Sequence, residues 1–163
     1  MSKRESLYRV FDGPGGLAEH FLKVGYVCHI MSGFESHQAN TVNHVREMIR
    51  PAIRHDMMKL YFDIDGSPVG YVVWAFLADD VVARIRQEGR IQLHPSEFNE
   101  GRQLWIIDLL VAPGRLKYVM ADLSSKVFAA ENELRYLRLE NGRPCVRHIR
   151  RGSDGRLKLG RSV

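Results

Sequence analysis

The clearest feature of the sequence is a long apolar run that carries a single charge. From Leu104 to Val111 every residue is apolar except Asp108, and the run is bounded by Gly101 and a Pro-Gly pair. Its content of Ile, Val and Trp is typical of a strand buried on both faces. A carboxylate buried there without a partner would be costly or would acquire a raised pKa. Asp108 is therefore predicted either to be hydrogen-bonded in the core or to open into a site.

Apolar residues at helical spacing predict two helices before the first strand. The first follows the glycine-rich stretch 13–16 and ends near Gly33. The second covers about 39–50, because Pro51 disfavours helical geometry in the residue before it. His37 then falls in the polar stretch between these two helices.

Two more helices are predicted further along the chain. Asp79 is expected to cap a short helix that ends at Gly89, and 90–100 has no clear period and is expected to be a connection. A last helical stripe begins at Leu116 and reaches Phe128.

The remaining strands are predicted as two hairpins. An Asp-Gly turn joins 59–64 to 69–75, and Asn141-Gly142 joins 135–140 to 144–149. The strand at 69–75 is apolar almost throughout and is expected to be central. This order of elements predicts an α/β (α+β) fold, with helices over a mostly antiparallel sheet.

The length of 163 residues fits one domain over 1–163. Within it, 1–13 is expected to be a loose lead-in and 150–163 a basic tail. No apolar run approaches the ~18 residues of a membrane span, and the N-terminus is too polar for a signal peptide. Only Cys28 and Cys145 are present, so no disulfide framework is expected. The expected location is the reducing cytoplasm.

Charge is distributed unevenly. The segment 134–163 has nine Lys and Arg against Glu140 and Asp154, a net charge of +7, whereas the whole chain carries +5. Such a basic end could meet nucleic acid, an acidic membrane surface or an acidic protein, or it could be a solvated tail. Nucleic acid is not expected, because the arginines do not alternate with exposed aromatic residues beyond Tyr136.

The histidines do not predict a metal site. None of the seven forms an i, i+4 pair with a Glu beside it, and no Cys joins them. A Walker loop is also absent, and the turn after Pro113 has one glycine. No bound cofactor is expected.

A strand that ends in VAP, followed by a turn and a helix, resembles the central βα unit of GNAT-type N-acyltransferases. In that superfamily the turn carries several glycines whose backbone N–H groups hold the coenzyme A pyrophosphate. Those glycines are missing here, so the resemblance implies a donor other than simple acetyl coenzyme A.

A closer resemblance is to the toxin-activating lysine acyltransferases encoded beside RTX pore-forming toxins. The matching segments, which follow the family's order within 24–149, are VGYVCHIMSGFESH, RPAIRHDMMKLY, DGSPVGYVVWAFL and GRQLWIIDLLVAP. This resemblance implies a GNAT-like fold and fatty-acyl transfer from acyl carrier protein to internal lysines of an RTX protoxin, by a cytoplasmic homodimer. Carried across by position, the family's two key residues are His37 and Asp108.

General chemistry agrees with those two roles. A lysine amine is protonated at neutral pH, and a histidine is suited to remove its proton. A buried Asp beside the imidazole would orient it and stabilise its charged form. The alternative is that His37 attacks the thioester and forms an acyl-enzyme. Without the resemblance, His37 would be interpreted as a solvated loop histidine.

Other residues have weaker assignments. Trp74 and Trp105 are expected in the core, with a smaller chance of lining an acyl groove, and Arg102 could lie near the donor's phosphate. The basic C-terminal end suits an acidic acyl carrier protein. The alternatives are a non-catalytic GNAT-like adaptor with a basic binding surface, and an N-acetyltransferase that uses acetyl coenzyme A.

Overall fold

The computed structural model describes residues 16–159, so the expected lead-in at 1–13 lies outside the described residues. The contacts of the chain divide it into two compact units. Of the described residues, the first unit contains 16–73 together with Asp108–Arg115, and the second contains Trp74–Ile107 together with 116–159. The expectation of a single domain stays a prediction.

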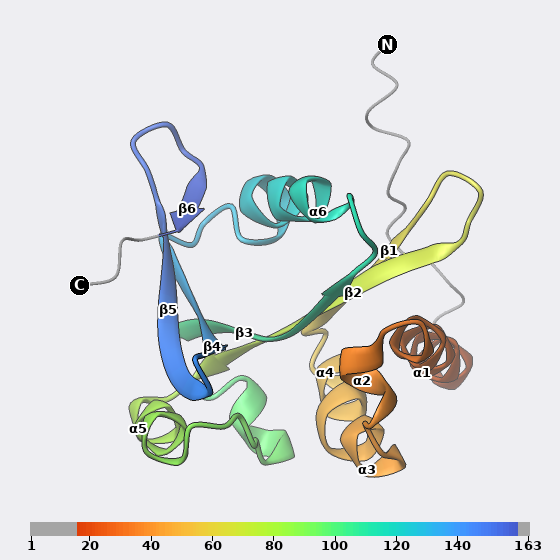
Figure 1. Ribbon diagram of the computed structural model, residues 1–163, viewed down its shortest axis with the longest axis horizontal. Coiled ribbons are helices and arrows are strands. Elements are labelled where there is room, and N and C mark those ends of the chain that lie inside the picture. Colours follow the sequence, from red (N-terminus) through yellow and green to blue (C-terminus); the bar gives the residue numbers. More distant parts are fainter. Residues whose placement is uncertain (1–15, 160–163) are drawn as a thin grey trace. The chain divides into compact units, whose positions relative to one another are not determined.

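Four helices and two strands make up most of the first unit. The helices are α1 (Leu17–Ser32), α2 (Glu35–Gln38), α3 (Val42–His44) and α4 (Arg50–Arg54), with a π-helical turn at Val45–Ile49; the strands are β1 (Met58–Phe62) and the first part of β2 (Pro68–Leu77). Figure 1 shows these helices on one side of β1 and the start of β2. β1 pairs antiparallel with β2, so the predicted hairpin is confirmed.

The predicted helix over 39–50 is wrong at both ends. The helical run begins with α3 at Val42 and continues through Pro51 to the end of α4 at Arg54. Pro51 lies in the first turn of α4, where its missing N–H is tolerated. The wider π-helical turn just before it, which closes with the Arg50 N–H bonded to Val45 O, lets the chain continue as a helix.

The second unit holds the rest of the strands and two helices. Its helices are α5 (Asp79–Glu88) and α6 (Leu116–Asp122), which continues as a π-helical turn at Leu123–Val127. Its strands are the end of β2 from Trp74 on, the first part of β3 (Gln103–Val111), β4 (Glu133–Glu140), β5 (Arg143–Arg151) and β6 (Leu157–Leu159). Figure 1 shows α5 and α6 on opposite sides of these strands.

The six strands follow the order β1-β2-β3-β4-β5-β6. β4 pairs antiparallel with β5, and β5 with β6, whereas β3 and β4 run parallel. The predictions of an α/β fold and a mostly antiparallel sheet flanked by helices are therefore confirmed.

The C-terminal hairpin is confirmed, but the tail is shorter than expected. Asn141 and Gly142 have φ values of 51° and 75°, as a tight hairpin turn with two left-handed residues requires. β5 continues through Arg151, and β6 pairs with it. The first and last described residues of the predicted tail are thus part of the sheet, because Ile149–Arg151 pair with Leu157–Leu159.

Each unit has its own apolar core. In the first unit, buried residues of α1, α4 and the two strands include Val27, Ala52, Leu60, Tyr61 and Tyr71. In the second unit, they include Leu77, Ile85, Phe98, Leu123 and Leu134. Gly101 is required there, because a Cβ atom at this position would lie 1.9 Å from the backbone of Leu77.

The short helix α5 departs from the prediction at its start. Ala78 is the N-cap residue, and Asp79 accepts a hydrogen bond from Gln103 instead of capping the helix. Gly89 ends α5 in a left-handed conformation with φ of 66°, as predicted.

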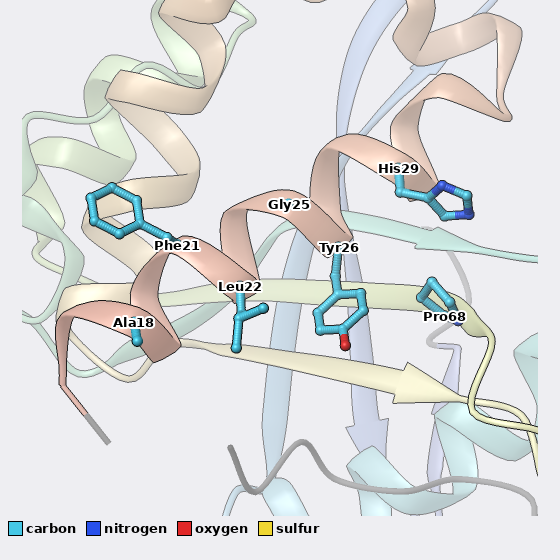
Figure 2. Close-up of a pocket in the computed structure, with 7 residues that line it drawn as sticks. All are labelled: Ala18, Phe21, Leu22, Gly25, Tyr26, His29 and Pro68. Atoms are coloured by element: carbon cyan, nitrogen blue, oxygen red, sulfur yellow. The ribbon is translucent and has the colours of Figure 1, made fainter. Parts of the chain in front are cut away.

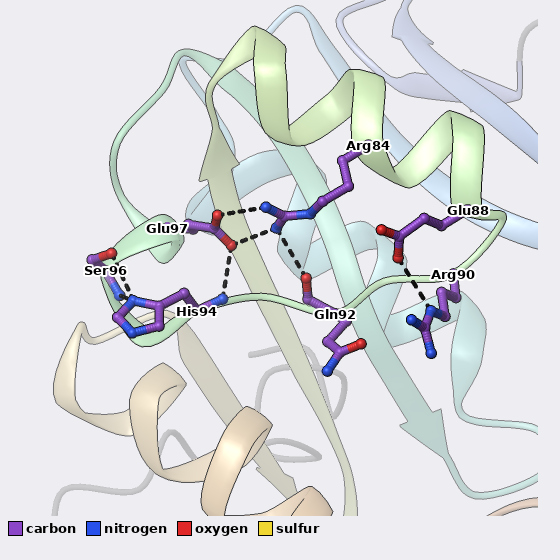
Figure 3. A network of polar contacts seen from close by, with 7 residues as sticks. All are labelled: Arg84, Glu88, Arg90, Gln92, His94, Ser96 and Glu97. Carbon is purple, nitrogen blue, oxygen red and sulfur yellow. Dashed lines mark hydrogen bonds and ion pairs between the residues drawn. The ribbon is translucent and has the colours of Figure 1, made fainter.

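Polar contacts order the connection at 90–100, which contains a 3-10 turn at Pro95–Phe98. Figure 3 shows that both terminal nitrogens of Arg84 bond to the Glu97 carboxylate, and that Nη2 also donates to Gln92 O at 3.1 Å. Glu97 in turn accepts a hydrogen bond from the His94 N–H. This network joins α5 to the segment that leads into β3.

Candidate functional site

Asp108 is the centre of a polar cluster in the first unit. The prediction that its strand is buried on both faces is wrong for 106–109, which are partly exposed, although Leu104, Trp105 and Leu110 are buried. β4 pairs with β3 at Trp105 and Ile106, two residues before Asp108. The Asp108 side chain keeps 13% of its surface exposed. It is both hydrogen-bonded and open to a site.

His37 lies on α2 and reaches Asp108. The helix α1 ends at Gly33, Phe34 adopts an extended conformation, and α2 then presents His37 from a single turn. His37 Nε2 lies 3.2 Å from Asp108 Oδ1, and the His37 side chain is 17% exposed. The structure therefore brings together the two residues predicted from the sequence, which are 71 positions apart.

The contacts of His37 indicate which ring nitrogen is basic. An ionised carboxylate only accepts hydrogen bonds, so the nitrogen that faces Asp108 carries the proton. The other nitrogen, Nδ1, lies 2.8 Å from the hydroxyl of the exposed residue Ser36. In this arrangement Nδ1 holds the lone pair and accepts from Ser36 Oγ.

Tyr71 on β2 holds the second oxygen of Asp108. Its hydroxyl donates to Asp108 Oδ2 at 2.6 Å, and the residue is fully buried. Burial and the negative charge of Asp108 raise the pKa of Tyr71 well above its ordinary value. Tyr71 therefore remains a hydrogen-bond donor at every pH at which the fold would be studied.

His44 on α3 is the third group near the carboxylate. Its Nε2 lies 3.7 Å from Asp108 Oδ2, beyond hydrogen-bond distance but within ion-pair range. Burial disfavours the charged form of Asp108, but contacts with His44, Tyr71 and His37 outweigh it and hold the pKa of this carboxyl below its ordinary value. Asp108 is therefore an anion at neutral pH.

An open apolar groove of about 720 Å³ lies along α1. Six residues of α1 from Ala18 to His29, together with Pro68 of β2, line it, and Figure 2 shows His29 and Pro68 at the end away from Ala18. Tyr26 packs edge-on against Phe62 of β1 at 5.0 Å between ring centroids. The groove is in the same unit as His37, and His29 lies four residues before the end of α1 at Gly33.

The other residues singled out from the sequence belong to the second unit. Trp105 is fully buried, as expected for a core residue, and its role in lining an acyl groove stays a prediction. Trp74 packs edge-on against Phe128 at 5.4 Å between ring centroids. Arg102 is exposed. Ligand-binding roles for Trp74 and Arg102 stay predictions.

Three members of the cluster were not predicted: Ser36, His44 and Tyr71. Tyr71 lies in the strand GYVVWAFL, where an aromatic residue looks like part of the core. His44 was assigned to the middle of a helix over 39–50, whereas it lies near the start of the helical run that begins at Val42. The available signal was Asp108 itself, because a carboxylate in an apolar strand requires donors nearby.

Between residues 16 and 159, no group of three or more His, Cys, Asp or Glu side chains is arranged to hold a metal ion. Within the same range, no helix combines the length and the apolar character needed to span a bilayer.

Comparisons with known proteins identify one matching family and two relatives of similar length. The model of the RTX toxin acyltransferase family (HlyC) matches residues 18–152. The lysine-acyltransferase RtxC of Vibrio cholerae is 25% identical over 112 residues, which cover 69% of this chain and 72% of that protein. An uncharacterized Synechocystis protein, sll0720, is also 25% identical over 112 residues, covering 68% of this chain and 76% of that protein.

A search of solved structures found a weak structural similarity. The similar structure is a crystal structure of histone acetyltransferase HPA2 and related acetyltransferase from Corynebacterium glutamicum, 12% identical, with a TM-score of 0.37. The similarity covers 82% of this chain and 78% of that one.

Proposed function

Because the chain belongs to the RTX toxin acyltransferase family, we propose that it transfers a fatty acyl group from acyl carrier protein to internal lysines of an RTX protoxin and thereby activates it. Family membership makes the chain an acyltransferase. The carrier thioester as donor, the protoxin lysine as acceptor, the homodimer and the cytoplasmic location are parts of the proposal. Two free cysteines suit a reducing compartment.

The contact between His37 Nε2 and Asp108 Oδ1 is the observation that carries this proposal. In the proposed reaction, His37 Nδ1 takes a proton from the lysine ammonium, and the free amine then attacks the thioester carbonyl. The C–S bond breaks, and the imidazolium gives its proton to the departing thiolate of the carrier. The neutral imidazole then takes the second proton from the new amide nitrogen and releases it to solvent. General-base help of this kind is typically worth roughly 10²- to 10⁴-fold.

Asp108 supports this chemistry through the second nitrogen of the ring. Its lowered pKa keeps it anionic, so it holds the His37 Nε2–H and stabilises the imidazolium formed at Nδ1. The Ser36 hydroxyl at 2.8 Å occupies the position that the substrate amine would take.

The groove along α1 offers a surface for the acyl chain. Its lining is apolar apart from His29 and the Tyr26 hydroxyl, and from Ala18 to His29 the helix rises by about 16 Å. The carbonyl end would point to the end of α1 from which the chain continues into α2 and His37. The chain would then lie against α1 toward Ala18.

The reaction can be tested with purified protein, acyl carrier protein loaded with a labelled fatty acid, and an RTX protein as acceptor. The proposal predicts amide-linked label on acceptor lysines, resistant to hydroxylamine. Single-turnover trapping without acceptor separates the two mechanisms. Direct transfer predicts no labelled enzyme, whereas an acyl-His37 intermediate predicts label that is lost in His37→Ala.

A further inference from the structure

His44 has a buried nitrogen that nothing in the described part of the chain satisfies. Its Nε2 is fully shielded from solvent and has no hydrogen-bond partner within residues 16–159. A buried donor without an acceptor costs free energy, so such an atom calls for an explanation. The polar atom toward which it points is Asp108 Oδ2, at 3.7 Å.

The carboxylate still has room for this donor. Oδ1 is used by His37, and Oδ2 accepts one hydrogen bond from Tyr71. Each carboxylate oxygen has two lone pairs, so Oδ2 can accept a second hydrogen bond. A ring nitrogen with a lone pair facing this anion would be repelled, which favours a proton on His44 Nε2.

The backbone next to His44 departs from a regular α-helix. It is the last residue of α3 and immediately precedes the π-helical turn Val45–Ile49. Single π-helical turns inside helices are frequent at functional sites. Here the turn follows a residue that lies beside Asp108.

We propose that His44 is a positioning residue, which donates its Nε2–H to Asp108 Oδ2 and, with Tyr71, fixes the carboxylate so that its other oxygen holds His37. The catalytic meaning of this contact rests on the proposed acyl transfer, but the contact itself does not. His44 acts through Asp108 and does not touch substrate. Its loss should therefore lower kcat and leave KM nearly unchanged.

The groups that face the carboxylate are His37 from α2, His44 from α3 and Tyr71 from β2, and Cys28 of α1 lies near Tyr71. Because three of these groups contact one anion, replacing any of them changes the others' environment. A test must therefore observe His44 directly as well as through activity.

The first test uses histidine-ring ¹⁵N NMR spectra of the native full chain. The His44 signals are assigned by their absence in His44→Gln. The proposal predicts a protonated Nε2 whose resonance shifts in Asp108→Asn and in Tyr71→Phe. A His44 ring with an unprotonated Nε2, or one that is insensitive to Asp108→Asn, would overturn the proposal.

The second test compares two His44 variants in acyl transfer. His44→Leu removes the donor and is expected to lower kcat by roughly 10- to 100-fold, the scale of a hydrogen bond to a charged group. His44→Gln restores an N–H donor and is expected to recover most of that loss. Equal rates for both variants and the native chain, or a loss confined to KM, would contradict the proposal.

The results distinguish a failure of the proposed function from a failure of the His44 inference. If the NMR result is as predicted and the native chain transfers no acyl group to any acceptor, the proposed function is wrong and the His44 contact stands. If transfer is observed and His44 Nε2 does not respond to Asp108, the proposed function stands and this inference is wrong.

Discussion

The Tyr71 hydroxyl donates a 2.6 Å hydrogen bond to Asp108 from a fully buried position on the neighbouring strand. This contact occupies Oδ2 and leaves Oδ1 directed at His37. An aromatic residue of the core thus sets the orientation of the carboxylate. Replacing its hydroxyl alone should disturb the site while leaving the packing intact.

Tyr71→Phe removes one donor to a charged acceptor without opening a cavity. The expected loss is about 1.5–3 kcal/mol of stabilisation of the ionised carboxylate, which corresponds to roughly 10- to 100-fold in kcat. Far-UV circular dichroism should be unchanged. Rates equal to those of the native chain would show that Tyr71 does not help to position Asp108.

The lowered pKa of Asp108 predicts a particular pH dependence of stability. Because the folded-state pKa lies below the ordinary value of 3.8, the ionised carboxylate stabilises the fold above that value. This contribution is lost as pH falls through the folded-state pKa. The free energies of unfolding in urea of the native chain and Asp108→Asn should therefore differ at about pH 5, and this difference should shrink below about pH 4.

One outcome of the urea unfolding measurements would contradict the lowered pKa of Asp108. A difference in the free energy of unfolding that grows as pH falls from about 5 to below about 4 would mean that the pKa of Asp108 is raised in the folded state. In that case burial would dominate over His37, His44 and Tyr71, and Asp108 would not be held as an anion by its partners.

The groove along α1 can be narrowed at Gly25. A Cβ atom there meets no other atom within 4 Å, and Gly25 lies inside a helix, so a larger residue should be accepted by the fold. Gly25→Leu is expected to slow transfer of long acyl chains more than that of short ones. Gly25→Ala is the matched control and should retain the native preference. The same slowing for all chain lengths would exclude the groove as the acyl site.

The basic C-terminal hairpin gives a prediction about the carrier. Arg138 and Arg143 are exposed near its turn, whereas Arg147 is paired with Glu140. If acidic acyl carrier protein docks here, its affinity should fall steeply between low and physiological salt. The double charge reversal Arg138→Glu with Arg143→Glu should weaken binding more than Arg90→Glu in the second unit. An affinity independent of salt would contradict this docking surface.

Much of the fold was predictable from the sequence because its signals are local. Turn residues such as Asn141-Gly142 fix hairpins through backbone conformation, and Gly89 ends a helix for the same reason. The path through Pro51 was not predictable, since it depends on a π-helical turn that the apolar pattern does not reveal. His44 immediately precedes that turn, and the apolar pattern gave no sign that it lies beside Asp108.

The exposure of apolar residues on α1 could also not be predicted from the sequence. Its spacing indicates a face packed on the core, and Val27, Ile30 and Met31 do pack there. Leu17 and Phe21, however, are 75% and 61% exposed. Periodicity shows which residues share a face of a helix, but it does not show whether another element covers that face.

The pairing of His37 with Asp108 was predicted from the family resemblance together with the isolated carboxylate in an apolar strand. Its remaining partners, Tyr71 and His44, could not be identified in the same way. A buried carboxylate requires donors, but the sequence does not state which residues of other elements reach it.

The central claim is that His37 and Asp108 catalyse acyl transfer to lysine. Its most direct test is intact-mass and peptide mass spectrometry of an RTX protein co-expressed with the native chain, His37→Ala, Asp108→Asn or the control His94→Ala, which changes a histidine of the second unit. The account predicts fatty-acyl mass on lysines with the native chain and the control, and a loss of roughly 10²-fold or more with either site variant. Undiminished acylation by His37→Ala would contradict it.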